Sequence, residues 1–103
     1  MKPEHQLNRI DHQILAILAD DPGRTAGEIG WHLFSYDKHV YHASIKDTQL
    51  AAKILGYLKD AGYVRSEFDM SRPPNKRIRE WQLTGRGHAA VALSHVAELH
   101  AAY

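Results

Sequence analysis

Hydrophobic positions in the first third of the chain repeat at helical spacing. One stripe of a helical wheel collects Leu7, Ile10, Ile14, Ile17 and Leu18. His12 falls on the opposite side of the wheel, as expected for an amphipathic helix. The segment DDPG at 20–23 follows and is typical of a helix end, so the first helix is predicted to stop there.

The next segment, TAGE, has the spacing of a capping box. The Thr25 hydroxyl can accept a hydrogen bond from the Glu28 amide, and the Glu28 carboxylate can accept one from the Thr25 amide. A short helix is therefore predicted through about Phe34. Its buried residues are expected to be Ile29 and Leu33.

The clearest helical pattern follows a loop expected over residues 35–46. Asp47 is expected to cap this helix, and Gly62 stands where a left-handed C-cap is needed. The inward stripe is predicted to hold Leu50, Ile54, Leu58 and Ala61. The opposite face collects Thr48, Gln49, Ala52, Gly56 and Lys59. That face is small and can form hydrogen bonds, which favours close approach to a partner.

Two short strands are predicted after this helix, over Val64–Met70 and Arg77–Leu83, because both are rich in β-formers. The tip SRPPNK between them supplies turn residues, and its prolines stay out of the ladder. Thr84 can cap a last helix over 85–102. The inner stripe of that helix is predicted to hold Ala89, Leu93, Val96 and Ala97.

The order of helices and hairpin resembles a winged helix-turn-helix. Three stretches, ILAILADDPGRTAGEI, LAAKILGYLKDAGYV and WQLTGRG, resemble the signature segments of MarR- and PadR-like bacterial regulators over about residues 7–90. The resemblance implies a mainly α fold with a small β-hairpin wing, a winged helix-turn-helix plus a C-terminal helix. The length of 103 residues indicates one domain over 1–103. The resemblance implies a winged-helix core at about 7–84 and a C-terminal helix at 85–103 that could serve dimerisation.

Charge is clustered rather than abundant. The 103 residues carry a formal net charge of +1, yet the stretch RPPNKRIR at 72–79 holds four bases and no acid. A basic hairpin can lie along phosphates or enter a minor groove. The predicted wing contacts are Arg72, Lys76, Arg77 and Arg79. The alternative is that these bases serve solubility alone.

The helix that begins near Asp47 is predicted to read base edges of double-stranded DNA. Gln49 can pair with adenine and Thr48 can contact a thymine methyl, while Ala52 removes bulk from the same face. The flanking bases Lys46, Lys53 and Lys59 are placed for phosphates. A polar solvent face is the alternative interpretation.

The start of the TAGE helix offers one more phosphate contact through Arg24 and Thr25. A plain capping box is the alternative, and Glu28 opposes anion binding there.

The last helix has a second apolar seam near heptad spacing: His88, Val91, His95, Leu99 and Ala102. We expect this seam to pair with the same helix of a second copy in a homodimer. Packing against the first helix of the same chain is the alternative.

Eight histidines raise the question of a metal site. His39 and His42 have H-x-x-H spacing, and His95 precedes Glu98 by one helical turn. No set of about four converging zinc ligands can be assembled from them, and His88, His95, Glu98 and His100 do not reproduce the ArsR-type pattern. No metal or cofactor is expected.

Enzyme chemistry is not expected either. The chain has no Cys, no glycine-rich phosphate loop and no Ser/His/Asp set in a strand–turn–helix context. No small-molecule substrate is evident. The N-terminus lacks a signal peptide and no apolar run could span a bilayer, so a cytoplasmic protein is expected.

The sequence therefore predicts sequence-specific binding of double-stranded DNA, as in a small bacterial or phage transcriptional regulator. One alternative is a winged-helix protein-interaction module of a larger assembly, because the fold serves both uses. Another is a DNA-binding protein of phage or plasmid replication or packaging.

Overall fold

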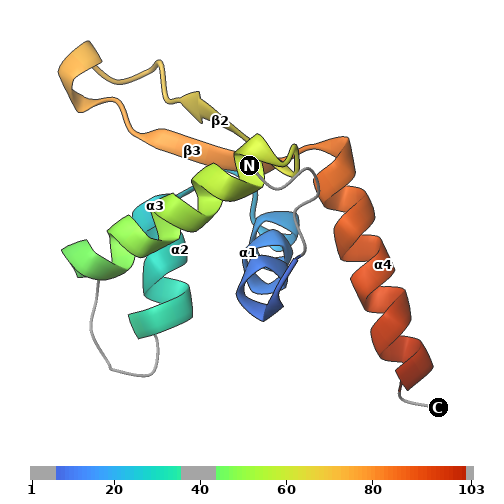
Figure 1. The fold of residues 1–103 in the computed structure, drawn as a ribbon. Coiled ribbons are helices and arrows are strands. Elements are labelled where there is room, and N and C mark those ends of the chain that lie inside the picture. Colours follow the sequence, from blue (N-terminus) through green and yellow to red (C-terminus); the bar gives the residue numbers. More distant parts are fainter. Residues whose placement is uncertain (1–6, 36–43, 102–103) are drawn as a thin grey trace.

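A computed structural model describes residues 7–35 and 44–101 of the chain. The elements follow in the order α1 (Arg9–Asp20), β1 (Arg24–Thr25), α2 (Ala26–Gly30), the π-helical turn η1 (Trp31–Ser35), α3 (Ile45–Asp60), β2 (Val64–Phe68), the 3-10 turn η3 (Pro74–Lys76), β3 (Arg79–Leu83) and α4 (Gly85–Ala101). The hairpin of β2 and β3 projects beyond the helical body at one end, and α4 extends away from the sheet at the other (Figure 1). The predicted fold class, mainly α with a β-hairpin wing and a C-terminal helix, is confirmed.

The sheet is antiparallel, with the strand order β1-β3-β2. Its main ladder pairs Val64 with Leu83 and Phe68 with Arg79. Both strands of the predicted hairpin are shorter than expected at the tip, where only the Asp69 amide still donates to the Ile78 carbonyl, at 3.1 Å. The two-residue strand β1 was not predicted from the sequence.

Helix α1 ends at Asp20, as predicted, and begins at a capping box formed by Asn8 and Asp11. The predicted stripe is confirmed at Ile14 and Leu18, which are buried, and at Leu7 and Ile17, which pack against the core, but not at Ile10. Ile10 is 37% exposed, whereas Leu15, which the prediction left out, is completely buried. The inner face of α1 packs against both β3 and α4.

Helix α3 begins earlier than predicted. Its N-cap is Ser44, whose Oγ accepts from the Asp47 amide at 3.1 Å. Ile45 and Lys46 therefore belong to the helix and not to the predicted loop, and Asp47 lies in the first turn instead of capping it. The other end agrees with the prediction, since Gly62 has φ +87°.

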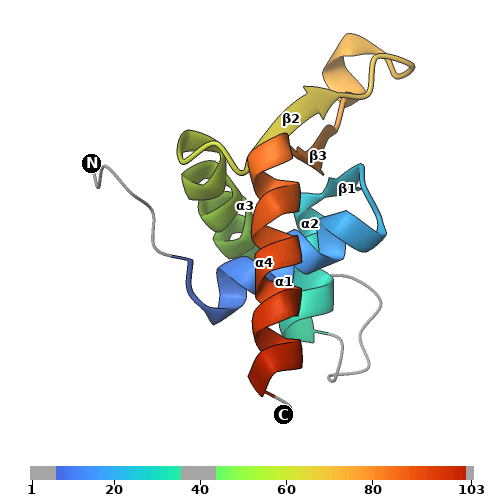
Figure 2. The ribbon, with the colours of Figure 1, turned by 90° about the vertical axis from the view of Figure 1, so that its right-hand side faces the viewer.

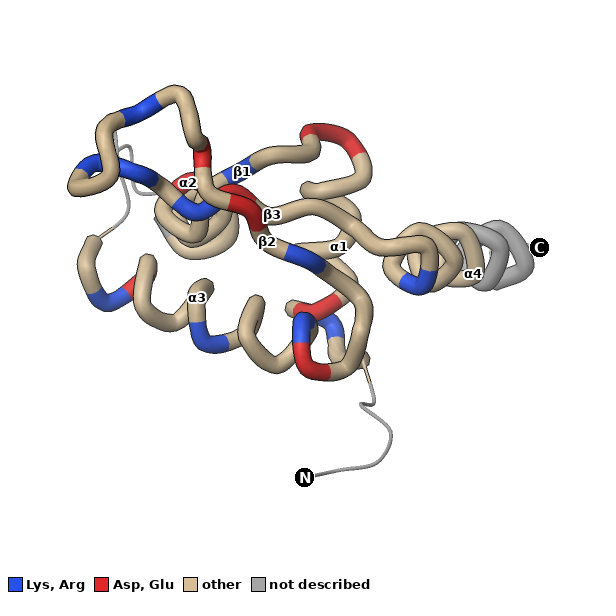
Figure 3. Tube along the Cα trace, turned by 90° about the horizontal axis from the view of Figure 1, so that it is seen from above, with Lys and Arg blue, Asp and Glu red and all other residues tan. Residues whose placement is uncertain are grey.

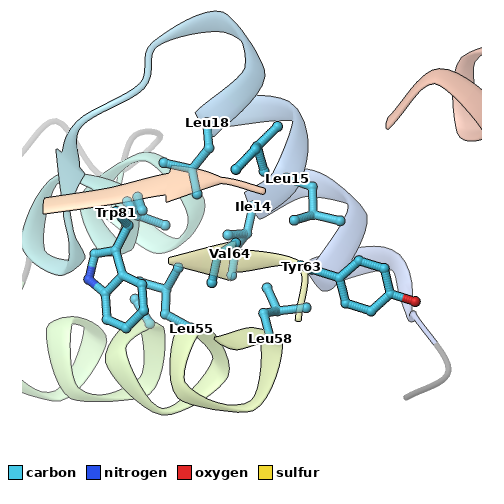
Figure 4. Close-up of a cluster of buried hydrophobic side chains, with 11 residues drawn as sticks. Ile14, Leu15, Leu18, Leu55, Leu58, Tyr63, Val64 and Trp81 are labelled. Atoms are coloured by element: carbon cyan, nitrogen blue, oxygen red, sulfur yellow. The ribbon is translucent and has the colours of Figure 1, made fainter. Parts of the chain in front are cut away.

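The buried face of α3 also differs from the predicted stripe. Ala51, Leu55 and Leu58 are fully buried, while Leu50 is 43% exposed. Leu58 is buried as predicted, and Ile54 and Ala61 are partly buried against the core, so the buried face overlaps the predicted stripe and also includes Ala51 and Leu55. Together with α1 and the sheet, this face forms the hydrophobic core (Figure 4).

Helix α4 is capped by Thr84, as predicted: its Oγ1 accepts from the Gly87 amide at 3.1 Å. The same hydroxyl donates to the Gly62 carbonyl at 2.6 Å. Arg86 donates to the Ala61 carbonyl at 2.8 Å and lies over the Tyr63 ring. A Cβ on Gly87 would come within 2.1 Å of the Tyr63 carbonyl oxygen, so only glycine fits there.

The predicted inner stripe of α4 is wrong where it can be compared with the structure. Ala89 is exposed and Leu93 is 71% exposed, while Ala90 and Val91 pack against the core. The close contact at Gly87 fixes this orientation. The side chains of Val96 and Ala97 lie outside the described part of the structure. Figure 2 shows α4 lying across α1. Across residues 7–35 and 44–101, no helix is both long and apolar enough to cross a bilayer.

Candidate nucleic-acid interface

Helices α2 and α3 form a tightly packed pair. The capping box of α2 is present as predicted, with 3.2 Å for both the Glu28 amide to Thr25 Oγ1 and the Thr25 amide to Glu28 Oε1. At the other end of α2, a Cβ on Gly30 would lie 2.8 Å from the Asp47 carbonyl oxygen. The absence of a side chain at Gly30 therefore sets how closely the first turn of α3 approaches α2.

A groove of about 550 Å³ runs between the start of α2, the length of α3 and strand β3. Four residues of the predicted small face of α3 line it: Thr48, Ala52, Gly56 and Lys59. Gln49 is exposed but does not line the groove. The opposite wall includes Ile78, Arg79 and Trp81 of the hairpin. The small residues of α3 thus leave open space beside the base of the wing.

The two faces of the hairpin carry different side chains, because side chains alternate along a strand and paired residues share a face. Phe68, Arg79 and Trp81 lie on the face that continues the core. The Arg79 guanidinium carbon lies 5.0 Å from the centre of the Phe68 ring and 5.9 Å from that of Trp81. This stacking holds the Arg79 charge beside the groove without neutralising it.

The opposite face of the hairpin is acidic and internally paired. It carries Glu67 and Glu80, which lie opposite each other in the ladder, together with Arg65. Arg65 bonds Glu67 at 3.0 Å and Gln82 at 2.8 Å. Of these two faces of the β2–β3 ladder, the Arg79 face is the one whose basic residue is not paired with a carboxylate.

At the tip, Asp69 organises the turn. Its carboxylate accepts from Ser71 and pairs with Arg72 Nε at 3.3 Å, so the pKa of Asp69 is lowered, first by the Ser71 hydrogen bonds and then by Arg72. Arg77 Nε donates to the Arg72 carbonyl at 3.3 Å. Asp69 thus partly compensates the Arg72 charge.

The remaining predicted wing bases are Lys76, Arg77 and Arg79. Within the described ranges, none of them forms an ion pair. Lys76 and Arg79 are exposed, and Arg77 is half-buried. Figure 3 shows several basic positions in blue along the hairpin and further ones on α3. The predicted flanking bases of α3, Lys46, Lys53 and Lys59, are all exposed.

Arg24 is engaged on the protein itself. Its guanidinium pairs with Asp21 and, at 2.7 Å, with Glu28. The pKa of Arg24 is raised, mainly by the hydrogen bond to Glu28. Burial alone would raise the pKa of Glu28, but hydrogen bonds from Arg24 and Thr25 outweigh it and lower the pKa. This pairing opposes the predicted phosphate contact at Arg24.

The predicted dimer seam is only partly visible. Val91 packs against the core of its own chain, so its assignment to an outward seam is wrong. His88 is exposed. The side chains of His95 and Leu99, and residue Ala102, lie outside the described part, as do those of Glu98 and His100 and the residues His39 and His42. In the described part, no three His, Cys, Asp or Glu side chains gather closely enough for a metal ion.

Sequence reasoning missed the aromatic support of the wing. The sequence predicts the two hairpin segments only as strands rich in β-formers, although Arg79 and Trp81 stand two positions apart and therefore share a face. That spacing was the available signal. The pairing with Phe68 depended on the register, which the sequence did not specify.

Comparison with known proteins supports the fold. No protein-family model and no curated protein matches the chain. A crystal structure of a conserved protein of unknown function, described as a potential transcriptional factor, superposes with a TM-score of 0.57. The two chains are 15% identical, and the match covers 94% of this chain and 86% of the other.

Proposed function

We propose that the protein binds double-stranded DNA sequence-specifically and acts as a small transcriptional regulator of the MarR- or PadR-like kind. In this proposal α3 enters the major groove, where Thr48 and Gln49 contact base edges. The wing lies along phosphates or in the adjacent minor groove. The description of the structural neighbour as a potential transcriptional factor supports this role.

The observation that carries the proposal is the position of Arg79. Its guanidinium rests on two aromatic rings at the wall of a groove whose other wall is the small face of α3. A DNA backbone beside α3 would meet this uncompensated charge together with Lys59. Asp60 also lines the groove and sets a limit on how deeply a phosphate could enter it.

We further propose that the protein acts as a homodimer. The face of α4 that carries Ala89 and Leu93 is exposed, and Leu93 is 71% exposed on a helix already packed against α1 on its other side. A second copy would cover this face, and the operator would then consist of two symmetric half-sites.

The test is fluorescence anisotropy with labelled random-sequence duplex DNA. If four wing and helix bases contact phosphates, affinity should fall roughly a hundredfold between about 50 and 200 mM salt. Selection of a preferred sequence from a random pool would follow. Absence of binding at the lower salt concentration would refute the proposal.

A protein-interaction module is the second candidate, favoured by apolar side chains on the wing. Met70 is 66% exposed, Phe68 49% and Ile78 38%. Exposed apolar groups that gather on one projection often mark an interface. Two results together would support this candidate: the wild type does not bind DNA, and Met70→Ser loses a protein partner that the wild type binds.

A further inference from the structure

A second and larger cleft, of about 1020 Å³, lies on the other side of α2, between α1 and η1. Its apolar wall includes Ile17, Trp31 and Leu33, all of which are half-buried. Drug-sized ligands commonly occupy clefts of this volume that combine an aromatic wall with a few polar groups. Apart from Thr48, none of its lining residues contacts DNA in the function proposed above.

The polar rim of the cleft is acidic. Asp20, Asp21 and Glu28 supply three carboxylates, and Arg24 is the only Lys or Arg side chain among the described lining residues. The Arg24 guanidinium is already shared between Asp21 and Glu28. Because the pKa of Glu28 is lowered, this carboxylate remains ionised at neutral pH. Counting the Asp, Glu, Lys and Arg side chains among the described lining residues, the rim carries two more negative than positive charges.

We infer that this cleft binds an organic cation with an aromatic or alkyl body. The apolar body would lie against Ile17 and Leu33, and the cationic centre would lie near the carboxylates, within reach of the Trp31 ring. An anionic ligand of the same size would meet the excess negative charge and bind weakly. The cleft thus selects for the charge of the ligand as well as for its bulk.

The cleft adjoins the groove beside α3. Thr25, Gly27 and Thr48 line both cavities. A Cβ on Gly27 would be 3.8 Å from the Oγ1 atoms of both Thr25 and Thr48, so the shared residues lie close together. A cation that competes with Arg24 for Glu28 would disturb the Thr25–Glu28 capping box and hence the wall of the groove.

Ligand binding should therefore change the affinity for DNA, and DNA should change the affinity for the ligand by the same factor. This coupling rests on the proposed DNA-binding function. The cation site itself does not, so the two are tested separately.

The site is tested without DNA, by isothermal titration calorimetry with two ions of equal size and opposite charge. Tetraphenylphosphonium should bind at least about tenfold more tightly than tetraphenylborate, since only the cation is attracted by the carboxylates and the indole ring. Equal affinity for both ions, or no binding of the cation, would overturn the inference.

Two substitutions locate the site. Asp20→Asn should weaken binding of the phosphonium ion about threefold, because it removes one exposed charge of the rim. Glu67→Gln, at an exposed carboxylate on the outer face of the wing, should leave binding unchanged. Equal effects of the two variants would place the cation elsewhere on the surface and overturn the assignment. Thermal melting of both variants confirms that they are folded.

The coupling is then tested by DNA anisotropy at saturating phosphonium. The wild type should change its DNA affinity several-fold, and Asp20→Asn should need a higher phosphonium concentration for the same change. The variant also controls for direct binding of the cation to DNA, which would affect both proteins equally. An equal response of the two proteins, or an unchanged DNA affinity, would overturn the coupling.

Discussion

The two sides of helix α2 offer opposite charge to a ligand. On the α3 side, the groove presents Lys59 and Arg79. On the α1 side, the cleft presents Asp20, Asp21 and Glu28. The two cavities meet at Thr25, Gly27 and Thr48, which line both of them. The net charge of +1 for the whole chain indicates neither the basic groove nor the acidic cleft.

Two arginines show how this difference arises. Arg24 is paired with two carboxylates, so its charge is compensated by the protein's own side chains. Arg79 lies over two aromatic rings, which orient the guanidinium and leave its charge available. The partners of a basic residue, more than its exposure, decide whether it can bind an anion.

The largest effect is expected where α2 meets α3. Gly30→Ala would push a methyl group against the Asp47 carbonyl, 2.8 Å away, and should lower the free energy of unfolding by about 1–3 kcal/mol. Gly56→Ala is the matched control. It has open space around it and should raise stability by about 0.5–1 kcal/mol. Urea denaturation measures both. Equal stability of the two variants would show that the packing of α2 on α3 does not depend on this close contact.

The next effect should distinguish the two faces of the wing. Arg79→Ala should weaken binding to all DNA sequences about tenfold and lower the salt slope by about one, because it removes a phosphate contact. Arg65→Ala, whose charge is paired with Glu67 on the outer face, should change affinity about twofold or less. Anisotropy titrations at several salt concentrations provide the measurement. An equal loss in both variants would contradict an interface confined to one face.

A smaller, sequence-dependent effect is expected on α3. Gln49→Ala should reduce discrimination at one base position by about 1 kcal/mol and leave non-specific binding nearly unchanged. Lys53→Ala should instead weaken preferred and random sequences equally. Competition between the selected sequence and single-base variants of it separates these outcomes. If Lys53→Ala changed base preference and Gln49→Ala did not, α3 would be docked in another orientation.

The smallest effect concerns the acidic side of α2. The pKa of Glu28 is lower in the folded protein than its usual value of 4.5, so its bonds stabilise the fold above that pH. This contribution should be lost as the pH falls below 4.5. Because the side chain is 47% exposed, it should amount to only about 0.5 kcal/mol. Glu28→Gln should reduce the change in the free energy of unfolding between pH 6 and pH 3 by about 0.5 kcal/mol. Urea denaturation at several pH values measures this change. A steeper dependence in the variant would contradict this sign.

The order of elements could be predicted from the sequence, because helix caps and turns are local. The DDPG end of α1, the TAGE box, Gly62 and Thr84 were all placed correctly. The start of α3 was also within reach. Ser44 stands three residues before Asp47, a spacing typical of a helix N-terminus, although the lack of a clear period over residues 35–46 predicts a loop there.

The buried faces of the helices could not be predicted as well. Each helix has more apolar residues than its inner face can hold, so two overlapping stripes fit the wheel equally well. Ile10, Leu50 and Leu93 are exposed, while Leu15, Leu55 and Val91 face the core. The choice between stripes is made by contacts with distant segments, such as that of Gly87 with Tyr63. The stacking of Arg79 on Phe68 could not be predicted for the same reason, because it depends on the register between two strands.

The junction around Thr84 has a mechanical consequence. Thr84 and Arg86 join the first turn of α4 to Gly62 and Ala61, at the point where α3 ends and the hairpin begins. Because Gly87 has no side chain, the first turn of α4 packs directly on the Tyr63 backbone, which leaves little room for α4 to shift there. A rotation of α4 would therefore act as a lever, turning the end of α3 and the base of the wing together instead of bending a hinge. A partner that binds α4 beyond its first turn would therefore set the angle at which α3 and the wing meet DNA or another partner.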